Sequence, residues 1–131
     1  QYERAQVLQW LLAADNEFAA PIAGWLNPLL GFVPLNPAAV GKCKADVKNA
    51  LLVLDGAIGQ TSFLVGDSLT LADIVMSCTL VNLFRFLLEP QERDQVGNVM
   101  RWFEACMALP EFKEVLGELV MCEKTIPIPT N

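Results

Sequence analysis

The sequence of 131 residues contains no histidine. This absence excludes imidazole general acid–base catalysis, Ser-His and Cys-His nucleophile pairs, and zinc sites built on imidazole. Basic residues are also few, because 9 Lys and Arg stand against 15 Asp and Glu and give a net charge of −6. A surface that follows phosphate groups needs clustered basic residues, so we expect no direct binding of nucleic acid.

Short motifs of common enzymes are missing as well. The sequence has no G-x-G-x-x-G, no P-loop and no G-x-S-x-G, so it gives no signal for a dinucleotide site, a phosphate loop or a hydrolase nucleophile. The four cysteines form no C-x-x-C pair, and each lies in an apolar pattern of helical spacing; they are Cys43, Cys78, Cys106 and Cys122. We expect buried, reduced thiols, with neither a disulfide framework nor a metal site.

Apolar residues are abundant, at 53% of the sequence with a mean hydropathy of +0.38. This content is too high for a disordered chain, and it exceeds what one core of this size is expected to bury. We therefore expect part of the apolar surface to face a partner. The run over 71–88 is barely long enough to cross a bilayer and contains Asp73, Asn82 and Arg85, so it predicts a buried helix and no membrane contact.

The spacing of apolar residues predicts an all-α fold. Helices are expected over residues 5–14, 17–30, 37–59, 71–88, 99–107 and 110–119. The second helix should be kinked or divided, because it contains Pro21, Gly24 and Pro28. A connector is expected over 61–65 and a polar turn over 91–98.

We expect one helical domain over residues 1–124, followed by an extended linker over residues 125–131. Two prolines in this last segment, Pro127 and Pro129, prevent a further helix. The sequence opens at Gln1 without Met, which we interpret as the start of a fragment of a longer chain.

The strongest local signal marks the start of the central helix. Thr70 stands at the N-cap position and Asp73 three residues later, so the two residues can satisfy each other's backbone amides as a capping box. Leu69 and Ile74 flank this box at the spacing of a hydrophobic staple. We interpret all four residues as structural.

Candidate site residues are few, and each has a structural alternative. Trp10 and Trp25 could line a ligand pocket or an interface, although aromatic residues at helical spacing are most often part of the core. The acidic pair Glu92 and Asp94, like the glutamates near residue 114, fits solvated turns and helix faces better than catalysis. Arg85 requires a salt bridge or a position at the surface. We assign no catalytic residue.

Two sets of residues resemble known proteins. The stretches 63–66 and 69–74 resemble the capped start of the central helix in the C-terminal domain of glutathione transferases. A second set is similar to the gamma subunit of eukaryotic translation elongation factor 1; its members are 88–90, 93, 101–103, 106, 110, 112, 115–118 and 122–124. Upstream residues 5–7, 9–10, 25, 28 and 30–31 fit the same subunit, so the resemblance spans nearly the whole chain.

The resemblance implies a glutathione transferase C-terminal-like helical bundle in a cytoplasmic translation factor. Members of this family anchor the beta subunit, which is the guanine nucleotide exchanger of the elongation factor 1 complex, and a homodimer is a further option. Glutathione, or a related thiol, is bound mainly by a preceding thioredoxin-like domain. The residues from Trp10 to Asp15 are the part of this half that could add pocket walls, so this fragment should need no cofactor and should not transfer thiols alone.

Two other functions stay open at this point. Joined to a thioredoxin-like domain, the chain could be a thiol S-transferase that uses glutathione or a related thiol. Similar helical modules also dock aminoacyl-tRNA synthetases to one another, so a docking module of a synthetase complex is the second alternative. The strings Arg101-Trp102-Phe103 and Cys122-Glu123-Lys124 favour the elongation factor.

Overall fold

The computed structural model describes residues 1–129, and within them all regular structure is helical, which confirms the all-α prediction. The elements in chain order are α1 (Tyr2–Ala13), η1 (Ala14–Ala19), α2 (Ala20–Leu30), α3 (Pro37–Ile58), α4 (Leu71–Asn82), η2 (Leu83–Leu87), α5 (Pro90–Arg93), η3 (Asp94–Val96), α6 (Gly97–Met107) and α7 (Pro110–Leu116). Here η1 and η2 are π-helical turns, and η3 is a 3₁₀ turn.

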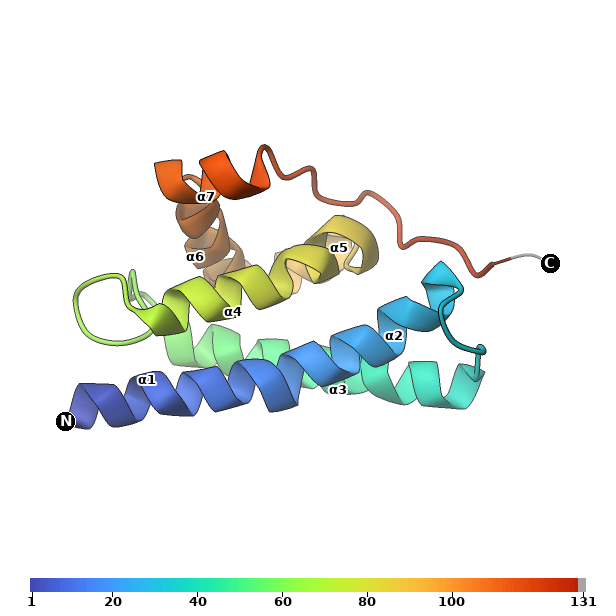
Figure 1. Cartoon of the computed structure of the whole chain (residues 1–131), viewed down its shortest axis with the longest axis horizontal. Helices are drawn as coiled ribbons and strands as arrows, with labels where there is room; N and C mark the ends of the chain where they lie inside the picture. Colours follow the sequence, from blue (N-terminus) through green and yellow to red (C-terminus); the bar gives the residue numbers. More distant parts are fainter. Residues whose placement is uncertain (130–131) are drawn as a thin grey trace.

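The first three elements form one continuous rod along the length of the molecule (Figure 1). The sequence predicted two separate helices here, which is wrong because η1 joins them without a break. In η1 the backbone N–H of Ala20 bonds to the carbonyl of Asp15, five residues earlier. This wider turn lies directly before Pro21, which has no N–H to offer to a carbonyl of the preceding turn.

Helix α3 returns along the rod and packs against α2. The rod ends at Gly31, whose φ of 84° is readily adopted only by glycine. Asn36 then caps α3, because its side-chain oxygen accepts hydrogen bonds from the N–H groups of Ala38 and Ala39 at 3.1 and 3.2 Å. Pro37 follows at the first helical position, where its missing N–H costs nothing.

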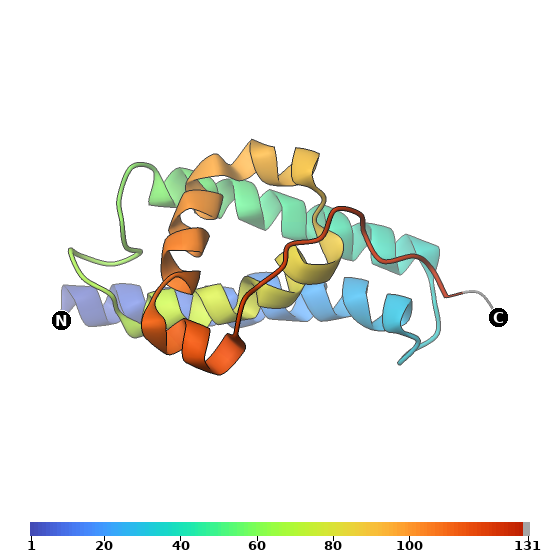
Figure 2. The same ribbon diagram turned by 90° about the horizontal axis from the view of Figure 1, so that it is seen from above.

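The second half of the chain covers one side of the pair formed by the rod and α3 (Figure 2). Helix α4 packs on α1, while α6 crosses from α4 to α3. The expected connector over 61–65 is confirmed. The polar turn predicted over 91–98 is wrong, because α5, η3 and the start of α6 make it helical. Helix α7 also ends earlier than residue 119, at Gly117 with a φ of 69°.

The core lies between the rod, α3, α4 and α6. Phe84 and Phe103 meet edge to face, with ring centroids 4.6 Å apart. Trp25 is 2% exposed and belongs to this core, so it lines no surface pocket, which corrects its interpretation as an interface residue. Lys44 lies over its ring at 5.5 Å. None of the helices in residues 1–129 has the length and apolar character needed to cross a membrane.

After α7 residues 117–129 form no helix or strand. Thr130 and Asn131, the end of the expected linker, lie outside the described residues. This segment does not leave the domain directly, because it passes along the end of η2 toward the end of the molecule opposite the N-terminus (Figures 1 and 2).

Candidate functional site

Asp73, at the start of α4, is completely buried and holds three elements together. Its carboxylate accepts hydrogen bonds from the N–H of Thr70 at 3.0 Å, the N–H of Leu64 at 2.9 Å and the indole N–H of Trp102 at 2.8 Å. The first bond confirms the predicted cap. The other two fix the preceding loop and α6 to the same carboxylate, so Asp73 is a structural centre and its donors keep a buried charge satisfied.

Leu69 and Ile74, the predicted staple residues, are not buried, since they are 40% and 38% exposed. They form one wall of an apolar surface groove of 480 Å³ between α4 and α7, which we call the α4–α7 groove. It is lined by Leu69, Ile74, Cys78, Leu109, Glu111, Phe112, Val115 and Leu116. With Cys78 and Glu111 as its ionisable members, the groove suits an apolar surface of another polypeptide segment better than a polar substrate.

Trp10 contributes to a second hollow, on the side where the rod meets α3. We call it the α1–α3 hollow; its volume is 160 Å³ and it is lined by Trp10, Ala13, Glu17, Phe18, Ala50, Val53 and Leu54. Val53 is 72% exposed on its rim. A shallow depression of 580 Å³ adjoins it and shares Glu17, Ala50 and Val53.

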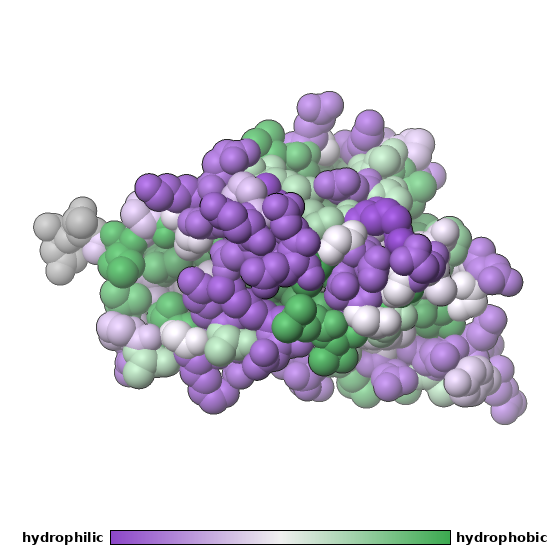
Figure 3. Space-filling model, turned by 180° about the vertical axis from the view of Figure 1, so that it is seen from behind, coloured by the Kyte–Doolittle hydropathy of each residue, from purple (hydrophilic) through white to green (hydrophobic). Residues whose placement is uncertain are grey.

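The depression adds polar groups beside these apolar walls, among them Asn16, Asp46 and Asn49. Seen from the side on which α3 and α6 lie, the surface is largely hydrophilic, with a small hydrophobic patch near its middle (Figure 3). Asp15 is exposed and lines neither the hollow nor the depression. Of the predicted pocket residues, only Trp10 therefore reaches a hollow, and Val53 was missed because an isolated exposed valine has no sequence signal.

The thiols differ from the prediction that all four are buried. Cys106 is buried, Cys43 and Cys122 are half-buried, and Cys78 is exposed in the α4–α7 groove. The apolar pattern of α4 runs around the helix, so it could not show which side faces solvent. Cys122 lies beyond the end of α7, in the extended segment.

The surroundings of three of these thiols favour the protonated form. The apolar walls of the α4–α7 groove partly shield the Cys78 thiol from water, and this partial desolvation raises its pKa. Burial and then the Asp73 carboxylate raise the pKa of Cys106 to about 11, although a hydrogen bond with Ser77 lowers it. Burial also raises the pKa of Cys122. Because the thiolate is the reactive form, these three groups are poorly suited to thiol chemistry.

Other chemistry has little support in residues 1–129. No group of three or more His, Cys, Asp or Glu side chains there is arranged to hold a metal ion. Arg85 is half-buried beside the Phe86 ring, with its guanidinium carbon 5.8 Å from the ring centroid. Of the two settings expected for Arg85, the salt bridge is not present among these residues, and the side chain instead lies partly exposed to solvent beside the ring. Glu92, one of the expected acidic pair, binds Lys48 instead of acting with Asp94.

Comparison with known proteins agrees with this arrangement. The family model described as glutathione S-transferase, C-terminal domain, matches residues 18–110. The chain belongs to this family. It is also similar to elongation factor 1-gamma-A of Xenopus laevis, at 42% identity over 121 residues, which confirms the second resemblance. That alignment covers 92% of the chain and 28% of the relative, so the chain spans about a quarter of the curated relatives it matches.

Solved structures of the family share the same fold. The GST-like domain of elongation factor 1-gamma from Saccharomyces cerevisiae superposes with a TM-score of 0.91 at 23% identity, over 98% of this chain and 58% of that one. The glutathione transferase URE2P6 from Phanerochaete chrysosporium, in complex with oxidized glutathione, gives a TM-score of 0.79 at 22% identity, over 88% and 53% of the two chains. At these identities the likeness concerns the fold.

Proposed function

We propose that this domain is a docking module of the translation elongation factor 1 complex and that it binds the beta subunit, the guanine nucleotide exchanger. The similarity to elongation factor 1-gamma supports the role in translation elongation, and with it a cytoplasmic location. The α1–α3 hollow is the observation that carries the docking role, because there half-buried Trp10 lies beside the exposed apolar side chain of Val53 on α3.

The composition of the hollow resembles the centre of a protein interface. Interfaces are built from aromatic and apolar residues inside a polar rim, and tryptophan often contributes a large share of the binding energy. Trp10 and Ala13 provide apolar walls and Val53 an apolar rim, while Glu17, and Asp46 in the adjoining depression, add acidic groups at the edge. The matching segment of the beta subunit should therefore insert an apolar side chain between basic neighbours.

The test is capture of purified beta subunit on this immobilised chain. Val53→Asp places a charge on the rim without removing a buried side chain, and it should abolish or strongly reduce capture. Val115→Asp is the matched control, because Val115 is 82% exposed but lies in the α4–α7 groove. Equal loss in both variants, or capture that neither variant changes, would exclude the hollow as the docking site.

Each alternative predicts a different result. A thiol S-transferase predicts that the chain joined to a thioredoxin-like domain is retained on immobilised glutathione and conjugates an aryl halide. A synthetase docking module predicts capture of an aminoacyl-tRNA synthetase in place of the beta subunit. A homodimer through the hollow predicts a doubled mass in solution that Val53→Asp reduces to that of one chain.

A further inference from the structure

The extended segment after α7 is bound along the end of the helix formed by α4 and η2. Three of its side chains pack against the core: those of Leu119, Met121 and Ile126. We call residues 119–126 the strap. In Figure 1 it runs along the top of the molecule, whereas α1 of the docking hollow lies along the bottom.

The strap supplies hydrogen-bond donors that the helix end lacks. The N–H of Leu88 bonds to Leu83, five residues earlier, and Pro90 has no N–H, so the carbonyls of Phe84 and Phe86 lose their usual helical donors. The strap replaces both. The N–H of Cys122 bonds to the carbonyl of Phe84 at 2.9 Å, and that of Ile126 bonds to the carbonyl of Phe86 at 3.0 Å.

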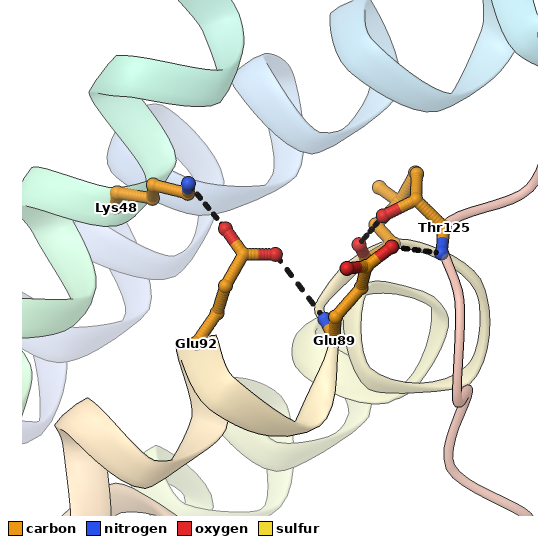
Figure 4. A network of polar contacts seen from close by, with 5 residues as sticks. Lys48, Glu89, Glu92 and Thr125 are labelled. Atoms are coloured by element: carbon orange, nitrogen blue, oxygen red, sulfur yellow. Dashed lines mark hydrogen bonds and ion pairs between the residues drawn. The ribbon is translucent and has the colours of Figure 1, made fainter.

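Thr125 provides two further bonds at the same place. Its hydroxyl donates to the carbonyl of Leu87 at 2.6 Å, and its N–H donates to the carboxylate of Glu89 at 2.9 Å. Figure 4 shows Glu89 between this threonine and the Lys48–Glu92 ion pair, with Glu92 also accepting from the N–H of Glu89. A polar network thus extends from α3 through α5 to the strap.

Arg93 of α5 binds the strap at Cys122. Its guanidinium donates to the carbonyls of Leu88 and Cys122, at 2.7 and 2.6 Å. The thiol of Cys122 also donates to Leu88, at 3.1 Å. The fold therefore binds the strap as it would bind a peptide, through its backbone, through three apolar side chains, of which Met121 and Ile126 lie beside the bonded positions, and through one hydroxyl.

We propose that the end of the α4–η2 helix is a binding site for an extended peptide, which the strap fills in cis and can leave while the rest of the domain stays folded. The ligand class is an extended segment with apolar side chains at the positions of Met121 and Ile126 and a hydroxyl at that of Thr125. The anchoring bonds come from one short stretch of half-buried residues, which is the pattern of a local opening unit.

Hydrogen exchange of the whole chain tests the release. Thr125→Val removes the hydroxyl donor but keeps the size of the side chain, and it should speed exchange of the Cys122 and Ile126 amides by roughly 3- to 10-fold, the effect of one lost hydrogen bond. Alkylation of Cys122, followed by mass spectrometry, should speed up to the same extent. Exchange of the Val99 amide in α6 should not change.

Thr79→Val is the matched control, because the Thr79 hydroxyl donates to the carbonyl of Val75 at 2.7 Å inside α4 and does not touch the strap. It should leave exchange of Cys122 and Ile126 unchanged. If Thr125→Val speeds exchange of the Val99 amide as much as that of the Cys122 amide, the strap opens only together with the whole domain. That result, or no acceleration at Cys122, would overturn the proposal.

A labelled peptide with the sequence of residues 117–128 tests recognition directly. The double variant Thr125→Val, Ile126→Asp weakens the strap in cis, so it should bind this peptide at least about 10-fold more tightly than the unchanged chain, whose own strap competes at high effective concentration. A peptide that carries Thr125→Val should bind more weakly. Equal affinity of both chains for the peptide would contradict the proposed site.

Discussion

The indole N–H of Trp102 donates a hydrogen bond of 2.8 Å to the carboxylate of Asp73, and this contact joins α6 to the first turn of α4. Both side chains are buried. The same carboxylate also accepts the N–H groups of Leu64 and Thr70. One acidic side chain therefore sets the positions of a loop, a helix start and a second helix.

Asp73→Ala should destabilise the domain strongly, because it leaves the buried indole N–H of Trp102 and the half-buried N–H groups of Leu64 and Thr70 without their acceptor. Each such donor costs about 1–3 kcal/mol, so we expect a loss of roughly 3–5 kcal/mol in the free energy of unfolding, measured with urea. Asp67→Ala is the control, since Asp67 is an exposed residue of the same loop and should change stability by about 0.5 kcal/mol or less. Similar values for both variants would show that Asp73 is no structural centre.

Gly24 allows α2 to approach α3 closely. A Cβ atom at this position would lie 2.6 Å from Sγ of Cys43, so Gly24→Ala should destabilise the domain by about 1 kcal/mol or more. Adding Cys43→Ala should recover most of this loss. Gly41→Ala, at a helical glycine of α3 with open space around it, should instead stabilise by about 0.5–1 kcal/mol. A stabilising Gly24→Ala would contradict the close packing.

Cys106 should make stability fall at alkaline pH. Its pKa is about 11 in the folded domain, against about 8.5 for an unperturbed thiol. Above pH 8.5 the unfolded chain loses this proton while the folded domain keeps it, so the free energy of unfolding falls between about pH 8.5 and 11, by up to about 1.4 kcal/mol per pH unit. Urea titrations of Cys106→Ala should show a shallower decline over this range. Identical slopes would contradict a protonated, buried thiol.

The Lys48–Glu92 ion pair should make the free energy of unfolding fall at acidic pH. Burial raises the pKa of Glu92, but the hydrogen bonds from Lys48 and the Glu89 N–H outweigh it and leave the pKa below its usual value. This stabilisation is present above the unfolded pKa of about 4.3 and is lost as pH falls through the lower folded pKa. Lys48→Met should remove about 0.2–1 kcal/mol near pH 6 and flatten the acid decline.

Lys42→Met serves as the control for this pH dependence, because it breaks the exposed Lys42–Asp46 pair on the same helix. It should leave the acid decline unchanged. Urea unfolding between pH 3 and 6 measures this loss of stability. If Lys48→Met leaves the loss unchanged, Glu92 has no role in the pH dependence.

Local patterns made much of the fold predictable. Thr70 and Asp73 lie three residues apart, so the start of α4 could be predicted from the sequence, and so could the cap formed by Asn36. The partner of Asp73 could not, because Trp102 follows 29 residues later in the sequence and no local rule connects them. The demand of a buried carboxylate for donors was the only signal that such a partner exists.

The strap and the exposed residues were missed for a related reason. Pro127 and Pro129 indicate only that a helix cannot continue there. The strap before them is held by the carbonyls of Phe84 and Phe86, whose helical donors are missing at the end of the π-helical turn η2. Cys78 was expected to be buried because α4 is apolar on every side. The face of α4 toward α7 lines a surface groove and is partly exposed. The sequence of one helix cannot show which of its apolar faces other elements leave uncovered.

The most direct test of the docking role is a calorimetric titration of the purified beta subunit into this chain. We expect saturable binding of one beta subunit per chain, weakened at least about 10-fold by Val53→Asp, which would place a charge against the apolar side chain of the bound segment, and unchanged by Val115→Asp. Absence of heat and of saturation with a folded chain, or equal binding by the unchanged chain and Val53→Asp, would contradict the account.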